Sequence, residues 1–148
     1  MEIVATLFSR LGVTTLFDDN IKESKSCFKR GVHKWISQNY PGAARDLSKA
    51  IELNPKYAEA YCYRGVVKCF LKDHAGAIQD LSKALKLNPK YAWAYYGRGQ
   101  AKYDLQDYTG AVQDYSKAIE HKPNTKYPLA YYGQGHTKEI VNDKEGVL

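Results

Sequence analysis

The stretch "DLSKALKLNPKYAWAY" at residues 80–95 decides the fold, because versions of it occur three times. "DLSKAIELNPKYAEAY" stands at residues 46–61 and "DYSKAIEHKPNTKYPLAY" at residues 114–131. Their prolines, Pro55, Pro89 and Pro123, are 34 residues apart. Self-similarity at a fixed period of this size is typical of solenoid proteins, in which each repeat stacks on its neighbours. The chain is therefore predicted to be a repeat protein.

Each unit contains two helical patterns. In the middle unit, the first runs from Ala58 to about Leu71 and the second from about Ala75 to Leu87. Asn88-Pro89 ends the second pattern, because the residue before a proline is pushed out of helical geometry. Small residues such as Gly65 let the two helices approach closely. One such pair cannot bury both of its faces, so neighbouring pairs are expected to stack.

This pattern resembles the tetratricopeptide repeat family, whose 34-residue unit has an aromatic residue at place four, glycine at eight, alanine at twenty and twenty-seven, and proline at thirty-two. The matching repeats are residues 24–57, where Cys27 replaces the aromatic residue, 58–91 and 92–125. A partial fourth repeat covers residues 128–148, with its first helix at about 128–142. The resemblance implies an all-α, right-handed superhelical solenoid of antiparallel helix pairs, with a concave groove lined by the first helices.

The two ends of the chain fall outside the three full repeats. Residues 1–23 are predicted to form an N-terminal capping segment, and a separate partner-binding segment is the alternative. Their apolar residues on one helical face are Ile3, Val4, Leu7, Phe8 and Leu11. At the other end, "DKEGVL" resembles the start of another second helix, and we expect the chain to be a fragment of a longer protein.

The composition favours a soluble, cytoplasmic protein. Hydrophobic residues make up 44% and charged residues 26% of the chain, which is ordinary globular composition, and the 13 tyrosines are an excess. Cys27, Cys62 and Cys69 include no CxxC pair, which argues against a disulfide framework and favours a reducing compartment. The sequence predicts no signal peptide and no membrane span, because apolar runs are short.

No pattern of residues predicts catalysis, and no cofactor or metal is expected. His33, His74, His121 and His136 fall in four different units without an HExxH motif. "GRGQAK" at residues 97–102 lies inside a helical pattern, so it is not a phosphate-binding loop. Ser48, Ser82 and Ser116 form a repeated surface pattern without a neighbouring base. The protein is predicted not to be an enzyme.

The resemblance also implies which side chains face a ligand. The residues predicted to line the groove are Phe28, Val32, Trp35, Tyr63, Phe70, Trp93, Tyr96, Gln100, Tyr103 and Tyr132; Cys62 and Val66 occupy further ligand-facing places. Tyr61, Tyr95 and Tyr131 stand at place four and are assigned to the core. An aromatic groove suits a peptide or helix of another protein, so the predicted function is a non-catalytic interaction scaffold or adaptor.

One subclass of the family binds the acidic tails of heat-shock chaperones with a clamp of lysines, asparagines and an arginine. The clamp places in this sequence hold Phe28, Val32, Tyr63, Trp93 and Gly97. We therefore expect no carboxylate clamp.

Net charge leaves a second class of partner open. The chain carries +6, and the repeats at 24–57 and 58–91 hold +5 and +3 of it. These basic repeats could instead bind RNA or another polyanion. Self-association through the open C-terminal end at residues 128–148 is a third possibility.

Cations recur at places seven and eleven of the first helices, and aspartates recur in the second helices. The positions are Arg30, Arg64 and Arg98, then Lys34, Lys68, Lys102 and Lys138, then Asp46, Asp80 and Asp114. Each aspartate follows its arginine by 16 residues, so we predict an ion pair that bridges the two helices; an anion-binding stripe is the alternative. Lys102 is predicted to lack an acidic partner and is therefore added to the ligand-contacting residues.

Overall fold

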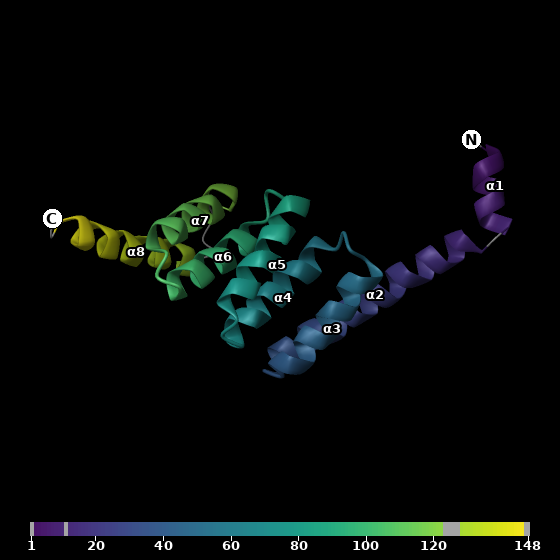
Figure 1. Cartoon of the computed structure of the whole chain (residues 1–148), viewed down its shortest axis with the longest axis horizontal. Coiled ribbons are helices and arrows are strands. Elements are labelled where there is room, and N and C mark those ends of the chain that lie inside the picture. Colours follow the sequence, from purple (N-terminus) through teal and green to yellow (C-terminus); the bar gives the residue numbers. More distant parts are fainter. Residues whose placement is uncertain (1, 11, 123–127, 147–148) are drawn as a thin grey trace. The chain divides into compact units, whose positions relative to one another are not determined.

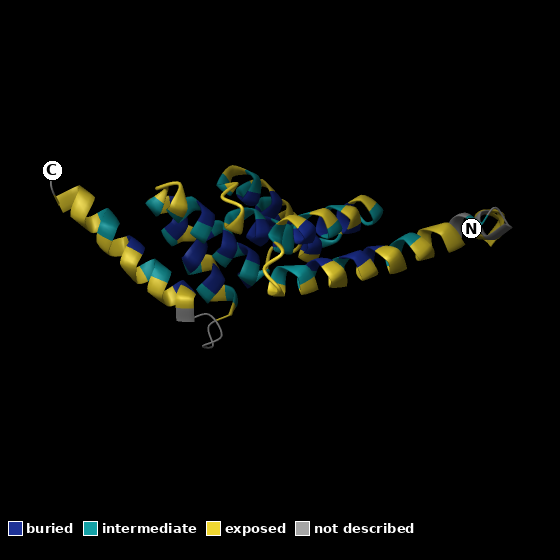
Figure 2. Cartoon of the chain, turned by 90° about the horizontal axis from the view of Figure 1, so that it is seen from below, coloured by how far each residue is buried: buried dark blue, intermediate teal, exposed yellow. Residues whose placement is uncertain are grey.

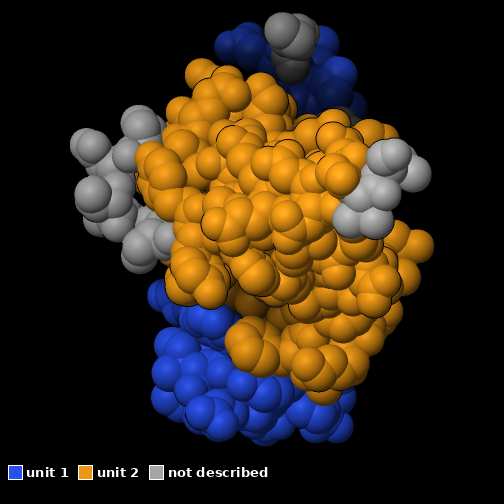
Figure 3. All heavy atoms as spheres, turned by 90° about the vertical axis from the view of Figure 1, so that its left-hand side faces the viewer, with its two compact units in different colours: residues 1–57 blue, residues 58–148 orange. Residues whose placement is uncertain are grey.

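A computed structural model describes residues 2–10, 12–122 and 128–146, which form eight α-helices and no strands (Figure 1). The helices are α1 Glu2–Arg10, α2 Val13–Ile36, α3 Tyr40–Leu53, α4 Ala58–Phe70, α5 His74–Leu87, α6 Ala92–Asp104, α7 Tyr108–His121 and α8 Pro128–Gly146. The predicted all-α fold is confirmed. The chain divides into two compact units, residues 1–57 and 58–148, which Figure 3 colours separately.

The second helix of every full repeat begins in the same way. A residue with positive φ comes first, namely Gln38 (62°), Lys72 (65°) and Gln106 (64°). The next side chain, of Asn39, Asp73 or Asp107, accepts a hydrogen bond from the backbone N–H three residues later, at 3.0, 2.9 and 3.0 Å. Asparagine and aspartate are favoured caps because they satisfy one of the free N–H groups at a helix start. These caps fix where α3, α5 and α7 begin.

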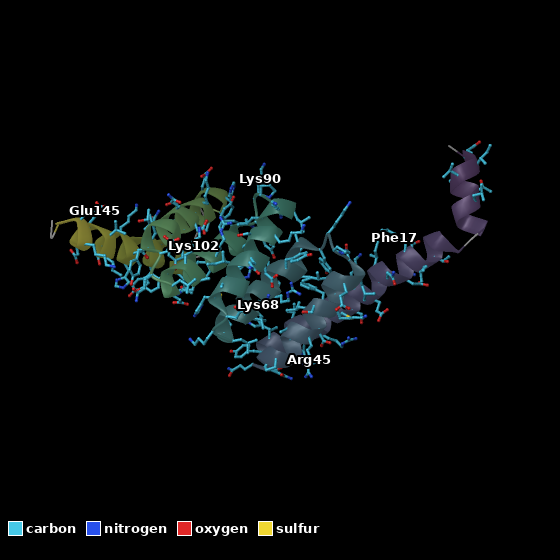
Figure 4. All side chains as sticks on the ribbon, in the orientation of Figure 1. Phe17, Arg45, Lys68, Lys90, Lys102 and Glu145 are labelled. Atoms are coloured by element: carbon cyan, nitrogen blue, oxygen red, sulfur yellow. The ribbon has the colours of Figure 1, made fainter. Side chains whose placement is uncertain are left out.

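The unit of residues 1–57 is built on a pair of helices, α2 and α3. Cys27 of α2 and Leu47 of α3 are buried between them, and the Ser24 hydroxyl donates a hydrogen bond of 2.8 Å to the carbonyl oxygen of Ala50. Helix α2 is 24 residues long, so the predicted boundary between residues 23 and 24 falls inside it. Phe17 projects from this helix and is exposed (Figure 4).

Helix α1 contacts α2 and no other described helix. Ile3, Val4 and Leu7, which were predicted to share an apolar face, are all exposed. The side chain of Phe8 and the whole of Leu11 lie outside the described residues.

The unit of residues 58–148 is a stack of helix pairs. Helix α4 packs on α5, α6 on α7, and α6 also contacts α4, α5 and α8. The buried residues lie between the helices, as Figure 2 shows. A Cβ atom added to Gly65 would come within 2.6 Å of Leu81 Cγ and 3.2 Å of the Ala77 carbonyl oxygen, so only glycine permits this approach. The predicted steric role of Gly65 is confirmed.

Helix α8 differs from two predictions made for the last unit. Asp143–Gly146 continues α8 and does not begin a second helix, so that part of the "DKEGVL" prediction is wrong; residues 147–148 lie outside the described chain. Tyr131 was assigned to the core, but 44% of it is exposed. The physical reason is that the described helices which pack on α8 are α6 and α7, and neither covers the face that carries Tyr131.

The predicted arginine–aspartate bridges are present, and each one includes a lysine. Arg64 donates two hydrogen bonds of 2.7 Å to the Asp80 carboxylate, and Lys68 Nζ lies 2.9 Å from Asp80 Oδ2. The same fork, paired two N–H to two oxygens, joins Arg98 to Asp114 at 2.9 and 2.8 Å. Such bidentate pairs combine charge with fixed geometry. Asp80 and Asp114 are buried, so the bridges belong to the scaffold.

Lys102 is part of such a bridge, and the prediction that it lacks an acidic partner is wrong. Its Nζ lies 2.9 Å from Asp114 Oδ2. The partner is 12 residues further along the chain, across the turn between α6 and α7. Lys68 and Lys102, both labelled in Figure 4, therefore neutralise the scaffold carboxylates on their own repeats.

The bridge in the 1–57 unit is looser. Arg30 Nη2 lies 3.4 Å from Asp46 Oδ1, and the arginine side chain is 55% exposed, whereas Lys34 Nζ approaches Asp46 Oδ2 to 2.7 Å. The hydrogen bonds from Lys34 and Arg30 outweigh the desolvation of Asp46 and lower the pKa of its carboxyl group. In this repeat the lysine is the closer partner.

The recurring serines connect neighbouring repeats, although the sequence suggested only a surface pattern. Arg98 Nη1 donates a hydrogen bond of 3.1 Å to Ser82 Oγ of the preceding repeat. In the fourth unit Gln134 takes the arginine's place, and its Nε2 donates a hydrogen bond of 2.7 Å to Ser116 Oγ. Place seven therefore contributes to stacking in both cases.

We predict that Gly65→Ala destabilises the 58–148 unit. The added methyl group overlaps Leu81, and overpacking of this kind costs about 1–3 kcal/mol of unfolding free energy. Gly135→Ala is the matched control, because nothing lies within 4 Å of a Cβ atom at Gly135. Removing a glycine from a helix is expected to add about 0.5–1 kcal/mol. Urea unfolding followed by circular dichroism measures both, and equal losses would contradict the steric argument.

We also predict that Asp80→Asn lowers the midpoint of thermal unfolding. The change leaves Arg64 and Lys68 as neighbouring cations without their carboxylate, and breaking a buried pair costs about 3 kcal/mol. Asp46→Asn should cost less, because Arg30 is exposed and its bond is long. If Asp80→Asn leaves the midpoint unchanged, the bridge does not stabilise the repeat.

Candidate functional site

The unit of residues 58–148 has a hollow of about 340 Å³ between α6 and α8. Helix α6 contributes Tyr96, Gln100 and Tyr103, α7 contributes Tyr115, and α8 contributes Leu129, Tyr132, Gly133 and His136. Four of these eight side chains are tyrosines, and no lysine, arginine, aspartate or glutamate lines the hollow. It is an aromatic site with polar tips.

Tyr115 forms the floor of the hollow because of its size. The equivalent residues of the other repeats are Leu47 and Leu81, which end in the core. A Cβ atom on Gly133 would lie 2.9 Å from Tyr115 Cζ, so glycine is what lets α8 rest on this ring. The Tyr115 hydroxyl donates a hydrogen bond of 3.3 Å to Gln100 Oε1.

Gln100 is held in place from both ends of its amide. Its oxygen accepts from Tyr115, and its Nε2 donates a hydrogen bond of 3.2 Å to Asp104 Oδ1. Both polar groups of the side chain are therefore engaged, and its orientation in the hollow is fixed. Amide assignments of this kind follow from the hydrogen-bond network.

The rings around the hollow support one another. The centroids of Tyr96 and Tyr115 are 5.9 Å apart, and those of Tyr103 and His136 are 6.1 Å apart. Tyr132 stacks on His136 at 6.1 Å with an interplanar angle of 12°. Aromatic pairs at these distances favour each other by about 0.5–1.5 kcal/mol beyond burial. The walls are thus braced in the absence of a ligand.

Burial keeps the tyrosine hydroxyls of the hollow neutral. Desolvation raises the pKa of Tyr115 and of Tyr96 above the ordinary value. A neutral phenol both donates and accepts hydrogen bonds. The hollow can therefore combine apolar contact with hydrogen bonds to a ligand at neutral pH.

The structure brings together four of the residues predicted to contact a partner, namely Tyr96, Gln100, Tyr103 and Tyr132. Trp93 lies beside them, stacked on Tyr96 at 5.5 Å. Tyr63 and Phe70 are on α4, and Phe70 is exposed. Lys102 is engaged with Asp114 and does not line the hollow.

The remaining predicted residues belong to the other unit. Phe28, Val32 and Trp35 are half-buried on α2, and the ring of Phe28 lies 4.9 Å from that of Tyr57. Two further places that the family pattern assigns to a ligand, Cys62 and Val66, are buried in the core. Val66 would meet a Cβ atom at Gly97 at 3.4 Å, so this face of α4 is closed by α6.

The sequence reasoning missed Tyr115 and Gly133. Tyr115 stands in a second helix, where the family pattern predicts a core residue, and Gly133 has no side chain to suggest a role. The one signal was the replacement of leucine by tyrosine at this place of the repeat. A larger polar ring at a core place indicates that something beyond the core is within its reach.

The described residues contain no group of three or more His, Cys, Asp or Glu side chains placed to hold a metal ion. Across residues 2–10, 12–122 and 128–146, no helix has the length and apolar character needed to span a bilayer.

Comparison with known structures gives consistent neighbours. The TPR domain of Arabidopsis OM64 is 26% identical, with 82% of this chain and 98% of that chain covered and a TM-score of 0.79. The Sgt2 TPR domain from Aspergillus fumigatus is 26% identical, with 85% and 84% covered and a TM-score of 0.78. The first TPR of Spaghetti (RPAP3), bound to the HSP90 peptide SRMEEVD, is 24% identical, with 82% and 94% covered and a TM-score of 0.78. Curated protein sequences gave no match.

Family models match the part of the chain that forms the helix pairs. A model described as "TPR repeat" matches residues 36–68 and 71–106, and one described as "Tetratricopeptide repeat" matches residues 92–125. These ranges extend from the end of α2 to the loop after α7 and include the bridged pairs α4–α5 and α6–α7. The chain belongs to the tetratricopeptide repeat family, whose domains are protein-interaction modules.

Proposed function

We propose that this protein is a non-catalytic interaction scaffold that holds a peptide or helix of a partner protein in the aromatic hollow between α6 and α8. The observation that carries the proposal is the hollow itself, with four tyrosines, one glutamine and one histidine around about 340 Å³. Tyrosine offers a large contact area at low cost in side-chain entropy and dominates many interfaces. An apolar or aromatic side chain of the partner fits this lining.

A partner with an acidic C-terminal tail fits it poorly. The Spaghetti (RPAP3) domain is bound to the peptide SRMEEVD. The clamp places in our chain hold Phe28, Val32, Tyr63, Trp93 and Gly97. Moving the clamp by one repeat gives Cys62, Val66, Gly97, Leu129 and Gly133, again without a cation or a side-chain amide. A carboxylate buried against these residues would lose its hydration without a compensating partner.

An RNA- or polyanion-binding role draws less support from the arrangement of charges. Lys68, Arg98 and Lys102 on the first helices are paired with buried aspartates and are not free to bind phosphates. The remaining predicted groove residues, Phe28, Val32, Trp35, Tyr63, Phe70 and Trp93, are proposed as additional protein contacts. The free thiols suit a reducing compartment, which supports a cytoplasmic location.

Truncating the rim of the hollow should weaken the partner without unfolding the domain. A peptide selected from a display library on the wild-type chain serves as probe. Tyr132→Ala should lower its affinity about tenfold, as expected of an interface hot spot. Tyr132 is 72% exposed, so the fold should tolerate the change. Tyr131→Ala, on the adjacent position outside the hollow, is the matched control. Equal affinity of the two variants would refute the assignment of the hollow.

The peptide SRMEEVD provides a test of partner class. We expect no binding by isothermal titration calorimetry at peptide concentrations up to about 1 mM, because no clamp is available. Binding in the micromolar range would contradict the proposed preference. For the selected peptide, a steep loss of affinity with added salt would instead favour a polyanion-binding role.

A further inference from the structure

The outer face of α8 lacks the covering helix that the same face has in the other repeats. Helices α2, α4 and α6 pack on α3, α5 and α7 respectively, whereas the described helices in contact with α8 are α6 and α7, on its inner side. Buried Ala130 and Thr137 mark that inner side. Most of the rest of α8 is exposed, as Figure 2 shows. Three internal examples therefore define what a covering helix on α8 would contact.

The glycine at place eight is the first mark of this unfilled position. A Cβ atom on Gly31, Gly65 or Gly99 would come within 2.8, 2.6 or 2.9 Å of a side chain of the second helix. Those side chains are Leu47, Leu81 and Tyr115. At Gly135 the same test finds no atom within 4 Å. A notch that accepts leucine or tyrosine in three repeats is thus open in the fourth.

The lysine at place eleven is the second mark. Lys34, Lys68 and Lys102 each lie 2.7–2.9 Å from an aspartate of the covering helix. Lys138 holds the same place on α8, is exposed, and forms no ion pair with any described residue. Gln134, in the arginine's place, is already bonded to Ser116. A covering helix on α8 therefore needs one carboxylate, opposite Lys138.

We propose that this face of α8, defined by Tyr131, Gly135 and Lys138, is a docking site for a helix of a partner protein. The occupant has the chemistry of the chain's own second helices: an aspartate for Lys138, followed directly by leucine or tyrosine for the Gly135 notch. Alanine stands three residues before the aspartate and four after it, as Ala77 and Ala84 flank Asp80. Helix α8 runs straight through Gly146 without turning back, so the occupant arrives from another molecule.

This site is separate from the aromatic hollow. The hollow uses Leu129, Tyr132, Gly133 and His136 of α8, whereas the docking face uses none of these residues. The docking site therefore does not rest on the proposed function, and either could fail alone.

The test uses a peptide with the sequence of residues 73–88, which carries Asp80 and Leu81. Short helices are marginal in water, so a staple joins positions 79 and 83, both exposed in α5. Fluorescence anisotropy measures its affinity for the whole chain. We expect binding to the wild type, a loss of at least about tenfold with Gly135→Leu, which fills the notch, and a similar loss with Lys138→Glu. Gly135→Leu removes a glycine from an exposed helical position, so circular dichroism should show no loss of helix.

A charge exchange makes the test specific. The peptide with Asp80→Lys should bind poorly to the wild type and recover its affinity for the Lys138→Glu chain. No binding up to about 1 mM, or equal binding to wild type and Gly135→Leu, would overturn the site. Failure of the exchanged pair to recover would overturn the assignment to Lys138. A dimer in light scattering that Gly135→Leu abolishes would overturn the choice of partner, because a second copy would be the occupant.

Discussion

The close approach of the two helices in each repeat, at the place-eight glycine, is the constraint on which the other features depend. Leu81 lies so near Gly65 that a single methyl group would collide with it. This short separation brings Arg64 and Lys68 of one helix within hydrogen-bonding distance of Asp80 on the other. With a larger residue at Gly65 the helices would separate, and the carboxylate would be left buried with weaker partners. Packing therefore determines the electrostatics of the repeat.

The bridges in turn shape the surface that is left for a partner. Each of Asp80 and Asp114 takes one arginine and one lysine, so most cations of α4 and α6 are engaged within the scaffold. The residues that remain on the ligand side are mainly aromatic. This division explains how a chain with a net charge of +6 carries an uncharged hollow. The basic character lies largely outside that site.

One change in the repeat pattern creates the hollow. Where the first two repeats have leucine, the third has Tyr115, which reaches past the core to α8 and donates a hydrogen bond to Gln100. Gly133 leaves room for this ring. The glycine places of the array thus have three outcomes: filled by leucine at Gly65, filled by tyrosine at Gly99, and open at Gly135. The same local sequence serves core packing in one repeat and leaves a surface notch in another.

The sequence by itself determined the period, the helix pairs and the arginine–aspartate bridges, because these depend on local propensity and on spacings that repeat every 34 residues. Only the tertiary structure decided the partner of Lys102, since its distance to Asp114 depends on how closely α6 and α7 pack across their turn. It also decided the role of Tyr115, because a ring in a second helix contacts the hollow only when α8 is in place. The state of Gly135 was hidden for the same reason. A glycine reads alike in sequence whether its notch is filled or open, and the difference lies in what the rest of the chain packs against it.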